Sequence, residues 1–306
     1  MKSIFEGTGV ALVTPFKDDK IDFDSLGKLI DAGIDGGVKA FVALGTTGEG
    51  VSVSTDERIE IIKFCKAAIG QKAKLIVGTG NNNFSTCYEN TRLAKELGAD
   101  GALVVTPYYN KTTQFGLIKY YQELSKLKFP MIMYNVPSRT GLMLELSTIG
   151  AIINANDWVY GIKESTSDAS RICKLCALCK DKISVYSGED ALNHLFYTQG
   201  GSGAISVTAN AFPDKVQKIF ELCKEGNFSD ALSLQHKLAP IDDALFFETN
   251  PIPIKYMLSQ KGICSPNVRL PLVQMSEEGK SKLNRNVRLF EQTETEKTIS
   301  TPVKVK

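Results

Sequence analysis

Eight short runs of apolar residues recur along the chain, and longer segments with helix-like spacing of apolar residues separate them. Each run is nearly continuous in apolar residues, which is typical of strands buried on both faces of a parallel sheet. Strand and helix thus alternate eight times over roughly 220 residues, which predicts an α/β fold of the (β/α)8 TIM barrel type. The runs are GVALVTPF from Gly9, AFVALG from Ala40, LIVGTG from Leu75, ALVVTP from Ala102, MIMYNV from Met131, VYGIKES from Val159, ISVYSG from Ile183 and AISVTAN from Ala204.

The segments between the runs carry signals for helix boundaries. In STDERIEIIKFCKAAIG, Ser54 stands three residues before Glu57, a spacing that predicts a capping box, and Gly70 is a usual C-terminal stop. An open doubly wound sheet fits less well, because it usually has fewer strands and a dinucleotide-binding fingerprint. GTTGEG at Gly45 and GGSG at Gly200 lack the spacing of that fingerprint and the lysine of a phosphate loop.

The pattern changes after the eighth helix, PDKVQKIFELCKEG. From about Asn227 onward the sequence is helical and shows no further strand signal. We therefore expect a catalytic barrel domain over residues 1–226 and a small all-helical C-terminal domain over residues 227–306. The last residues, QTETEKTISTPVKVK, are polar and without periodicity, which predicts a loose tail after about residue 291.

Composition restricts the class of ligand and the compartment. The 306 residues carry 36 basic and 34 acidic side chains, a net charge of +2 that does not suggest binding to nucleic acid or to a membrane surface. No run approaches the roughly 20 apolar residues that span a bilayer, and the N-terminus lacks the features of a signal peptide. We expect a cytoplasmic protein with a small-molecule ligand.

The seven cysteines, an odd number in a chain of this size, fit reduced thiols better than a secreted disulfide framework. Cys173, Cys176 and Cys179 form CxxCxxC, which resembles part of an iron–sulfur or zinc motif. However, the segment has helical spacing and lacks a fourth ligand or a nearby histidine. We interpret these cysteines as small residues on one helix face and expect no metal.

Charged residues are scarce in the eight runs, where only Lys163 and Glu164 carry charge. Because strand side chains alternate, one of the two must face the barrel interior and the other the helix layer. A lysine in the interior loses hydration, which favours the neutral amine that attacks a carbonyl. Lys163 is therefore a candidate for Schiff-base formation; the alternative is a lysine that pairs with a carboxylate for structure alone.

Other polar residues follow the strands, where the active site of such a barrel lies. Tyr134 lies near the end of the fifth run and is able to shuttle protons if a neighbouring hydroxyl, such as that of Thr46 or Tyr109, accepts or donates in turn. Arg139 follows the same run and suits bidentate capture of a carboxylate. Each residue alone is common at a core or surface position, but together they predict a site for acidic carbonyl compounds.

Several motifs in a fixed order resemble the dihydrodipicolinate synthase family, also called the 4-hydroxy-tetrahydrodipicolinate synthases. The resemblance runs from about Gly7 into the helical C-terminal region. It implies condensation of pyruvate with aspartate semialdehyde on the route to diaminopimelate and lysine. The motifs are GTTGEG from Gly45, VTPYYNK from Val105, YNVPSRTG from Tyr134, GIKES from Gly161, YSGED from Tyr186, GAISVTAN from Gly203 and ETNPIPIK from Glu248.

The resemblance also implies the residues that act in catalysis. Lys163 would form the imine with pyruvate, and Tyr134 would act as acid and base at that centre. Thr46 would link Tyr134 to Tyr109, which in this family reaches in from the neighbouring subunit. The resemblance further implies a homotetramer built as a pair of dimers.

The residues that bind the substrates follow from the same resemblance. Thr47 would hold the pyruvate carboxylate, and Arg139 would hold the carboxylate of aspartate semialdehyde. Gly188 and Ile205 would line the pyruvate pocket. No cofactor is implied, because the protonated imine is itself an electron sink.

One departure from the family pattern concerns regulation. Members inhibited by lysine bind it at the dimer interface with polar and charged residues that typically include histidines and a glutamate. Only two of the corresponding residues here look suited to that role, so the sequence predicts weak or absent inhibition by lysine. The positions are Gly50, Val51, Thr55, Arg58, Asn82, Thr86 and Tyr108, of which Asn82 and Tyr108 match.

Two other functions remain open on the sequence. N-acetylneuraminate lyase and the keto-deoxy sugar-acid aldolases share the barrel, the lysine and the tyrosine of the fifth strand, but we expect them to replace Arg139 and to carry a GSTGE-like motif. A barrel that has lost catalysis and serves as a binding or scaffold protein is the second alternative.

Overall fold

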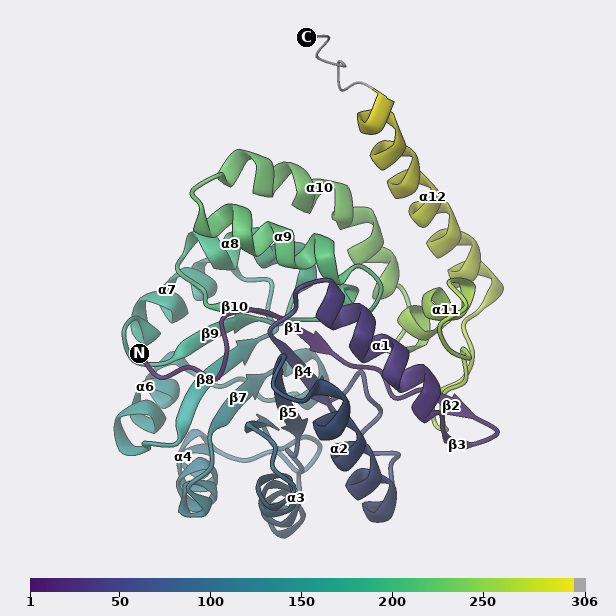
Figure 1. Cartoon of the computed structure of the whole chain (residues 1–306). Helices are drawn as coiled ribbons and strands as arrows, with labels where there is room; N and C mark the ends of the chain where they lie inside the picture. Colours follow the sequence, from purple (N-terminus) through teal and green to yellow (C-terminus); the bar gives the residue numbers. More distant parts are fainter. Residues whose placement is uncertain (300–306) are drawn as a thin grey trace.

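The computed structural model describes residues 1–299 of the chain, and of residues 293–299 only their helix. Eight parallel strands close into a barrel in the order β1-β10-β9-β8-β7-β6-β5-β4 (Figure 1). The closed ring confirms the predicted TIM barrel. The barrel strands are β1 (Gly7–Ala11), β4 (Ala40–Ala43), β5 (Lys74–Gly78), β6 (Gly101–Val105), β7 (Met131–Asn135), β8 (Val159–Glu164), β9 (Ser184–Ser187) and β10 (Gly203–Ser206).

The first apolar run is longer than the strand that it forms. β1 ends at Ala11, and the chain then enters a two-stranded antiparallel hairpin of β2 (Phe16–Lys17) and β3 (Lys20–Ile21). Two residues with positive φ, Asp18 (51°) and Asp19 (58°), form its turn. The sequence pattern did not predict this hairpin, because each of its strands is only two residues long.

Helices surround the barrel (Figure 1). α2 begins with the predicted capping box between Ser54 and Glu57, and its C-cap Gly70 has a φ of 57°, which a glycine adopts without strain. The helices up to the end of the barrel are α1 (Phe23–Asp35), α2 (Thr55–Ile69), α3 (Phe84–Glu96), α4 (Gln114–Leu124), α5 (Pro137–Thr140), α6 (Leu146–Ala155), α7 (Ala169–Cys179), α8 (Asn193–Thr198) and α9 (Pro213–Lys224).

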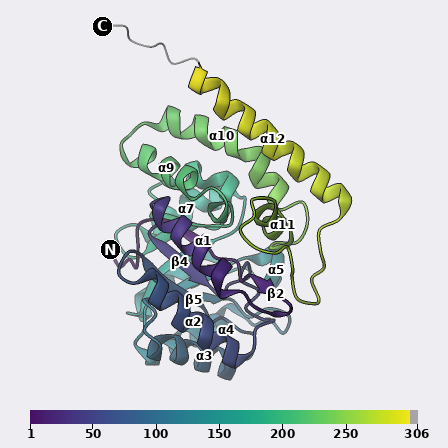
Figure 2. The same cartoon turned by 45° about the vertical axis from the view of Figure 1, so that its right-hand side comes forward.

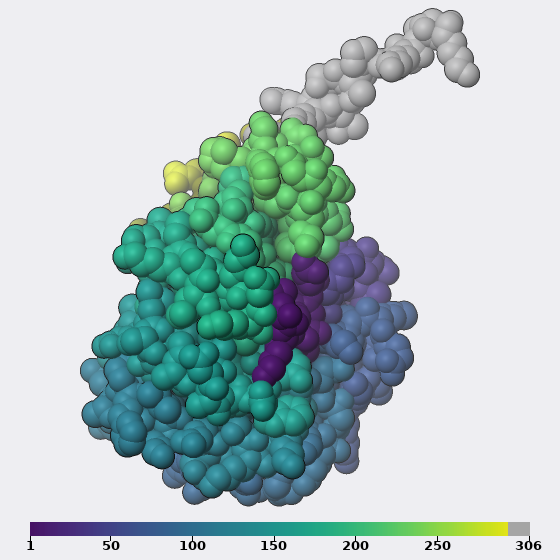
Figure 3. Space-filling model, turned by 90° about the vertical axis from the view of Figure 1, so that its left-hand side faces the viewer, coloured from purple at the N-terminus to yellow at the C-terminus, as the bar shows by residue number. Residues whose placement is uncertain are grey.

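The N-terminal end of the barrel is filled by aromatic side chains. The rings of Phe5 and Tyr186 stack with their centroids 4.4 Å apart, and the Tyr186 hydroxyl donates a hydrogen bond to the Phe5 carbonyl at 2.7 Å. The preceding residues lie along the outside of the barrel, where Lys2 forms a bridge with Ile183 (Figure 3). This packing supports the expectation that ligands enter from the opposite end, where the strands have their C-termini.

Three further helices follow the barrel: α10 (Phe228–Leu245), α11 (Ile252–Gln260) and α12 (Glu277–Ile299). α12 lies along α10 and also contacts α11 (Figure 2). No strand follows β10 within residues 1–299. The connection between α9 and α10 contains the expected boundary at residues 226 and 227, and the division into two domains stays a prediction.

The expected tail after residue 291 differs from the structure. α12 continues to Ile299, so part of that segment is helical. Glutamate, lysine and glutamine have good helix propensity even where apolar periodicity is absent, and periodicity was the signal that the sequence interpretation used. Residues 300–306 lie outside the described residues.

Within the described part of the chain, no helix has both the length and the hydropathy to cross a bilayer.

All seven cysteines are free thiols, and burial raises the pKa of Cys65 to about 12. Of the three cysteines on α7, Cys173 is exposed whereas Cys176 and Cys179 are buried. Among residues 1–299, no group of three or more histidine, cysteine or acidic side chains is arranged to hold a metal ion.

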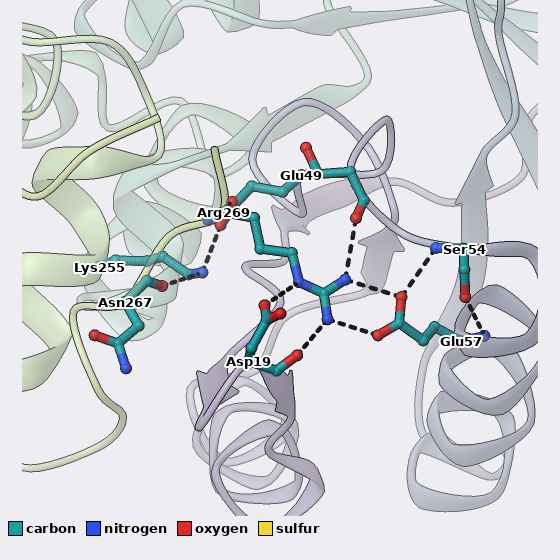
Figure 4. Close-up of polar contacts among 8 residues, drawn as sticks. Asp19, Glu49, Ser54, Glu57, Lys255, Asn267 and Arg269 are labelled. Atoms are coloured by element: carbon teal, nitrogen blue, oxygen red, sulfur yellow. Dashed lines mark hydrogen bonds and ion pairs between the residues drawn. The ribbon is translucent and has the colours of Figure 1, made fainter. Parts of the chain in front are cut away.

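The segment between α11 and α12 is attached to the barrel by Arg269 (Figure 4). Its guanidinium binds the Glu57 carboxylate through two hydrogen bonds of 2.6 and 2.8 Å, and it also donates to the Ser52 carbonyl at 3.0 Å and to Asp19 Oδ1 at 3.0 Å. These contacts join the C-terminal region to α2, to the loop before it and to the hairpin. Because bidentate pairs fix both distance and direction, Arg269 determines how this segment lies on the barrel.

The Glu57 carboxyl has a pKa lowered to about 2, chiefly by the hydrogen bonds from Arg269. A carboxyl with a lowered pKa stabilises the folded state above its unfolded value of about 4.5 and loses that contribution as the pH falls toward 2. We expect Glu57→Gln to lower the free energy of unfolding at about pH 7, and this difference from the parent protein to narrow steadily below about pH 4.5. Urea denaturation at a series of pH values measures this difference in the free energy of unfolding. The exposed Glu89→Gln is the control, and a difference that stays constant with pH would contradict the assignment.

Candidate active site

A cavity of about 360 Å³ opens at the C-terminal end of the barrel. This volume suits small metabolites, and its wall combines apolar strand residues with a few polar groups. Seven of the eight predicted site residues line this one cavity, although they come from five separate parts of the sequence. They are Thr46, Thr47, Tyr134, Arg139, Lys163, Gly188 and Ile205.

Lys163 and Glu164 face opposite sides of β8, as alternation requires. Lys163 is in register with Tyr134 of β7, and its Nζ lies 4.6 Å from the centre of the Tyr134 ring inside the cavity. Lys163 is buried, with 6% of its surface exposed, and within the described residues it forms no ion pair. The alternative of a lysine paired with a carboxylate for structure alone therefore lacks the partner that it requires.

Glu164 points instead toward the helices outside the barrel. It accepts a hydrogen bond from Asn135 Nδ2 at 2.7 Å and pairs with the Arg171 guanidinium at 3.0 Å. Burial raises the pKa of the Glu164 carboxyl, and Arg171 and Asn135 oppose that shift. Glu164 thus belongs to the packing between strand and helices, and Lys163 is the residue of this pair that faces the cavity.

Thr46 and Thr47 lie in a tight turn directly after β4. The Glu49 amide donates to the Thr46 carbonyl at 3.1 Å, and the Gly50 amide donates to the Gly45 carbonyl at 3.2 Å. Thr47 is buried, and its hydroxyl accepts a hydrogen bond of 2.9 Å from Asn250 Nδ2. The turn therefore presents both threonines at the rim of the cavity.

Arg139 lies on α5, a four-residue helix that begins with Pro137 directly after β7. Its guanidinium donates to the Asn250 carbonyl at 3.3 Å and lines the cavity. No carboxylate pairs with it in the described part of the chain. The guanidinium is thus available to an anionic ligand.

Gly188 lies directly beside Lys163. A Cβ atom at this position would stand 2.8 Å from Lys163 Cε and would overlap the Ser165 hydroxyl. Only glycine leaves the lysine side chain in its place, so the requirement is for space rather than for an unusual φ. Ile205 of β10 forms an apolar part of the same wall.

Tyr109 is the one predicted site residue that the structure places elsewhere. It lies outside the cavity with 92% of its surface exposed, and its φ is +67°. Within one chain, Tyr109 does not meet Tyr134, and the proposed relay between them is incomplete.

The sequence interpretation missed several residues of the cavity, and Glu189 and Asn250 are the two whose polar groups matter most for a ligand. Glu189 follows β9, where the rule that polar residues after strands form the site would have found it. Burial raises the pKa of the Glu189 carboxyl, Asp190 raises it further, and Lys163 opposes the shift. Asn250 lies between α10 and α11, so no barrel pattern places it in the cavity. Its side-chain Oδ1 is buried and has no hydrogen-bond partner.

A second cavity of about 520 Å³ adjoins the first and shares Thr46, Tyr134 and Arg139 with it. Six of the seven positions considered for lysine binding line it, and Asn82 does not. They are Gly50, Val51, Thr55, Arg58, Thr86 and Tyr108. The Arg58 guanidinium is buried and donates to the Gly50 and Gly78 carbonyls at 2.8 and 3.1 Å.

Comparison with known proteins identifies the family of this chain. Residues 4–289 match the dihydrodipicolinate synthetase family. The chain belongs to this family. Its members are lyases of the Schiff-base aldolase type, which confirms the enzyme class and the resemblance drawn from the motifs.

Individual relatives match over nearly their whole length. A 4-hydroxy-tetrahydrodipicolinate synthase from Clostridium novyi is 39% identical over 295 residues, which cover 96% of this chain and 99% of that protein. The chloride-inhibited dihydrodipicolinate synthase from Acinetobacter baumannii, solved with pyruvate, has a TM-score of 0.91 at 37% identity and covers 94% of this chain and 99% of that one. A monomeric dihydrodipicolinate synthase variant has a TM-score of 0.92 at 36% identity, with coverage of 94% and 97%.

Proposed function

We propose that this protein is a 4-hydroxy-tetrahydrodipicolinate synthase, which condenses pyruvate with L-aspartate 4-semialdehyde through a Schiff base on Lys163. The observation that carries the proposal is a buried lysine amine that lacks an ion-pair partner within the described residues and opens into a small cavity beside Tyr134. The structure of a 37% identical relative in complex with pyruvate supports the choice of the first substrate.

The chemistry begins with attack of the Lys163 amine on the ketone carbon of pyruvate. The carbinolamine loses water to give a protonated imine, which withdraws electrons from the neighbouring methyl group. Loss of a methyl proton gives an enamine, whose carbon attacks the aldehyde of the second substrate and forms the carbon–carbon bond. Tyr134, whose ring lies beside Nζ, is the group that we assign to proton transfer at this centre.

The carboxylates of the two substrates need separate partners. We assign the pyruvate carboxylate to the turn that carries Thr47, and the carboxylate of the semialdehyde to Arg139, whose guanidinium lines the cavity. Gly188 and Ile205 leave space for pyruvate next to Lys163. The carboxylate of Glu189, which lines the same cavity, is available to accept a hydrogen bond from the ammonium group of the semialdehyde.

Tyr109 completes the site only if a second chain supplies it. We propose a proton relay in which Thr46 connects Tyr134 to Tyr109 of the partner subunit, within a homotetramer built as a pair of dimers. The exposed side chains of Val51 (79%), Tyr109 (92%) and Leu270 (81%) support an interface on this side of the molecule, because Val51 and the chain neighbours Tyr108 and Pro271 all line the second cavity. One of the similar structures is that of a monomeric dihydrodipicolinate synthase variant, so the assembly of this chain stays a proposal.

The sugar-acid aldolases of the same superfamily were the nearest alternative on the sequence, and the relatives named 4-hydroxy-tetrahydrodipicolinate synthase favour the main interpretation over it. The motif GTTGEG and an unpaired Arg139 in the cavity favour the aspartate semialdehyde reaction. A coupled assay that compares aspartate semialdehyde with N-acetylmannosamine as the second substrate decides between the two.

We further propose that the enzyme works in the cytoplasm, where the seven free thiols would stay reduced.

The first prediction concerns the covalent step. Incubation with pyruvate and borohydride is expected to add the mass of one reduced pyruvate imine per chain, and peptide mapping is expected to place it on Lys163. Lys163→Met should abolish the adduct, whereas Lys224→Met, which removes an exposed lysine, should not. An unlabelled parent protein would favour a barrel without catalysis, and a label on another lysine would remove the proposed mechanism.

The second prediction tests Tyr109 in trans. Lys163→Met and Tyr109→Phe homo-oligomers should each have little activity. After subunit exchange, a mixed dimer has one site with an intact Lys163 and an intact tyrosine from its partner. An equal mixture should therefore recover up to about a quarter of the parent activity. If Tyr109 acts within its own chain, both sites of the mixed dimer are defective and activity does not recover.

The third prediction concerns regulation by lysine. Among the described residues, the second cavity offers the ligand ammonium no free carboxylate, because both oxygens of its lining residue Glu49 accept hydrogen bonds from Lys255 and Arg269. Arg58 adds like charge. Initial rates should therefore change little at sub-millimolar lysine. Thr86→Glu supplies the missing carboxylate and should increase the response, whereas strong inhibition of the parent enzyme would contradict this interpretation.

A further inference from the structure

We infer that Lys255 is a positioning residue for the first substrate: through Glu49 it holds the turn of Thr46 and Thr47 in the geometry that binds a 2-oxo acid. This inference rests on the proposed function and deepens it. Lys255 does not line the active-site cavity, so any effect on substrate binding has to pass through the turn.

The turn after β4 adopts a backbone conformation that needs support. Glu49 has a φ of +49° and Leu44 a φ of +60°, both in the left-handed region that residues with a Cβ rarely occupy. Such conformations persist where surrounding contacts determine them, and they are frequent at ligand sites. The amide of Glu49 closes the turn on the Thr46 carbonyl, so the position of Glu49 fixes the position of the two threonines.

Lys255 supplies the contact that holds Glu49. Its Nζ donates to Glu49 Oε1 at 2.5 Å and to the Asn267 carbonyl at 2.7 Å, and it lies 4.2 Å from the centre of the Phe16 ring. The exposed fractions of the two side chains are 0% and 1%. Glu49 Oε2 accepts a hydrogen bond of 2.9 Å from the backbone amide of Arg269 (Figure 4). Neither charge can leave its partner without remaining buried and unpaired, which is costly.

α11 holds the turn at a second point. Asn250, two residues before this helix, donates to the Thr47 hydroxyl, and Lys255 lies in the middle of the same helix. The backbone of Lys255 is hydrogen-bonded to the Pro251 carbonyl, so the two contacts belong to one rigid piece of chain. α11 therefore places Thr47 and Glu49 relative to each other.

Stability alone does not explain a fully buried ion pair. Replacing such pairs with well-packed apolar residues is often neutral or stabilising, so the pair is weak support for a purely structural role. The pair does fix position: the short contact between the buried Lys255 ammonium and the buried Glu49 carboxylate holds the turn after β4 in one place relative to α11. The segment fixed here is the one that carries the proposed carboxylate-binding threonines.

The experiment measures the pyruvate concentration that gives half-maximal borohydride trapping, which requires no second substrate. We compare the parent protein with Lys255→Met and with the double variant Glu49→Gln, Lys255→Met, which leaves no unpaired buried charge. Lys280→Met is the matched control, since Lys280 also lies in the C-terminal region but pairs with the exposed Glu277. Circular dichroism and thermal unfolding show that each variant is folded at the assay temperature.

Both Lys255 variants should still be labelled on Lys163 at saturating pyruvate, with half-saturation raised by about tenfold or more, as misplaced binding groups cause. The Lys280→Met variant should stay within about twofold of the parent. If Lys255→Met does not fold, the double variant decides. A folded double variant with the half-saturation of the parent overturns the positioning role while the proposed function stands. A parent protein that pyruvate does not label overturns the proposed function, and this inference with it.

Discussion

Strand alternation in a closed barrel is the constraint on which the rest of the structure depends. Neighbouring residues of β8 must face opposite sides, so Lys163 and Glu164 cannot share an environment. Glu164 forms an ion pair with Arg171 outside the barrel. On the neighbouring strand β7, the register places Asn135 beside Glu164 and Tyr134 beside Lys163. The register of β7 and β8 thus places the Glu164–Arg171 ion pair among the helices, and it places the Lys163 amine beside the Tyr134 ring in the cavity.

Two buried lysines show how the same side chain takes different roles in one fold. Lys255 is surrounded by a carboxylate, a carbonyl and an aromatic face, so all of its contacts come from the protein. Lys163 has an aromatic face on one side and a cavity on the other. A lysine whose partners are complete contributes to architecture, whereas a lysine that opens to a cavity is available to react with a carbonyl. Burial alone does not separate the two roles.

The sequence predicted the barrel for physical reasons that can be identified, and it singled out residues that the structure gathers around one cavity, whose catalytic roles stay predictions. Doubly buried strands read as continuous apolar runs, and the site of such a barrel follows the strands, so Lys163, Tyr134 and Arg139 stand out. Asn250 and Lys255 belong to helices after the barrel, and only long-range packing places them against the turn after β4. The hairpin of β2 and β3 is too short to give a periodic signal, and α12 continues through residues whose helix propensity, not periodicity, keeps them helical.

The position of the turn after β4 explains why the C-terminal helices matter to a site built on barrel strands. Lys163 and Tyr134 lie on strands and are held by the hydrogen-bonded ring, which determines their positions without outside help. Thr46 and Thr47 lie on a turn with two residues of positive φ and have no such ring around them. The contacts that replace it come from Asn250, Lys255 and Arg269, which lie some 200 residues later in the chain. The barrel thus fixes the two residues assigned to the covalent step. The turn assigned to the pyruvate carboxylate is fixed by a later segment of the chain that packs against it.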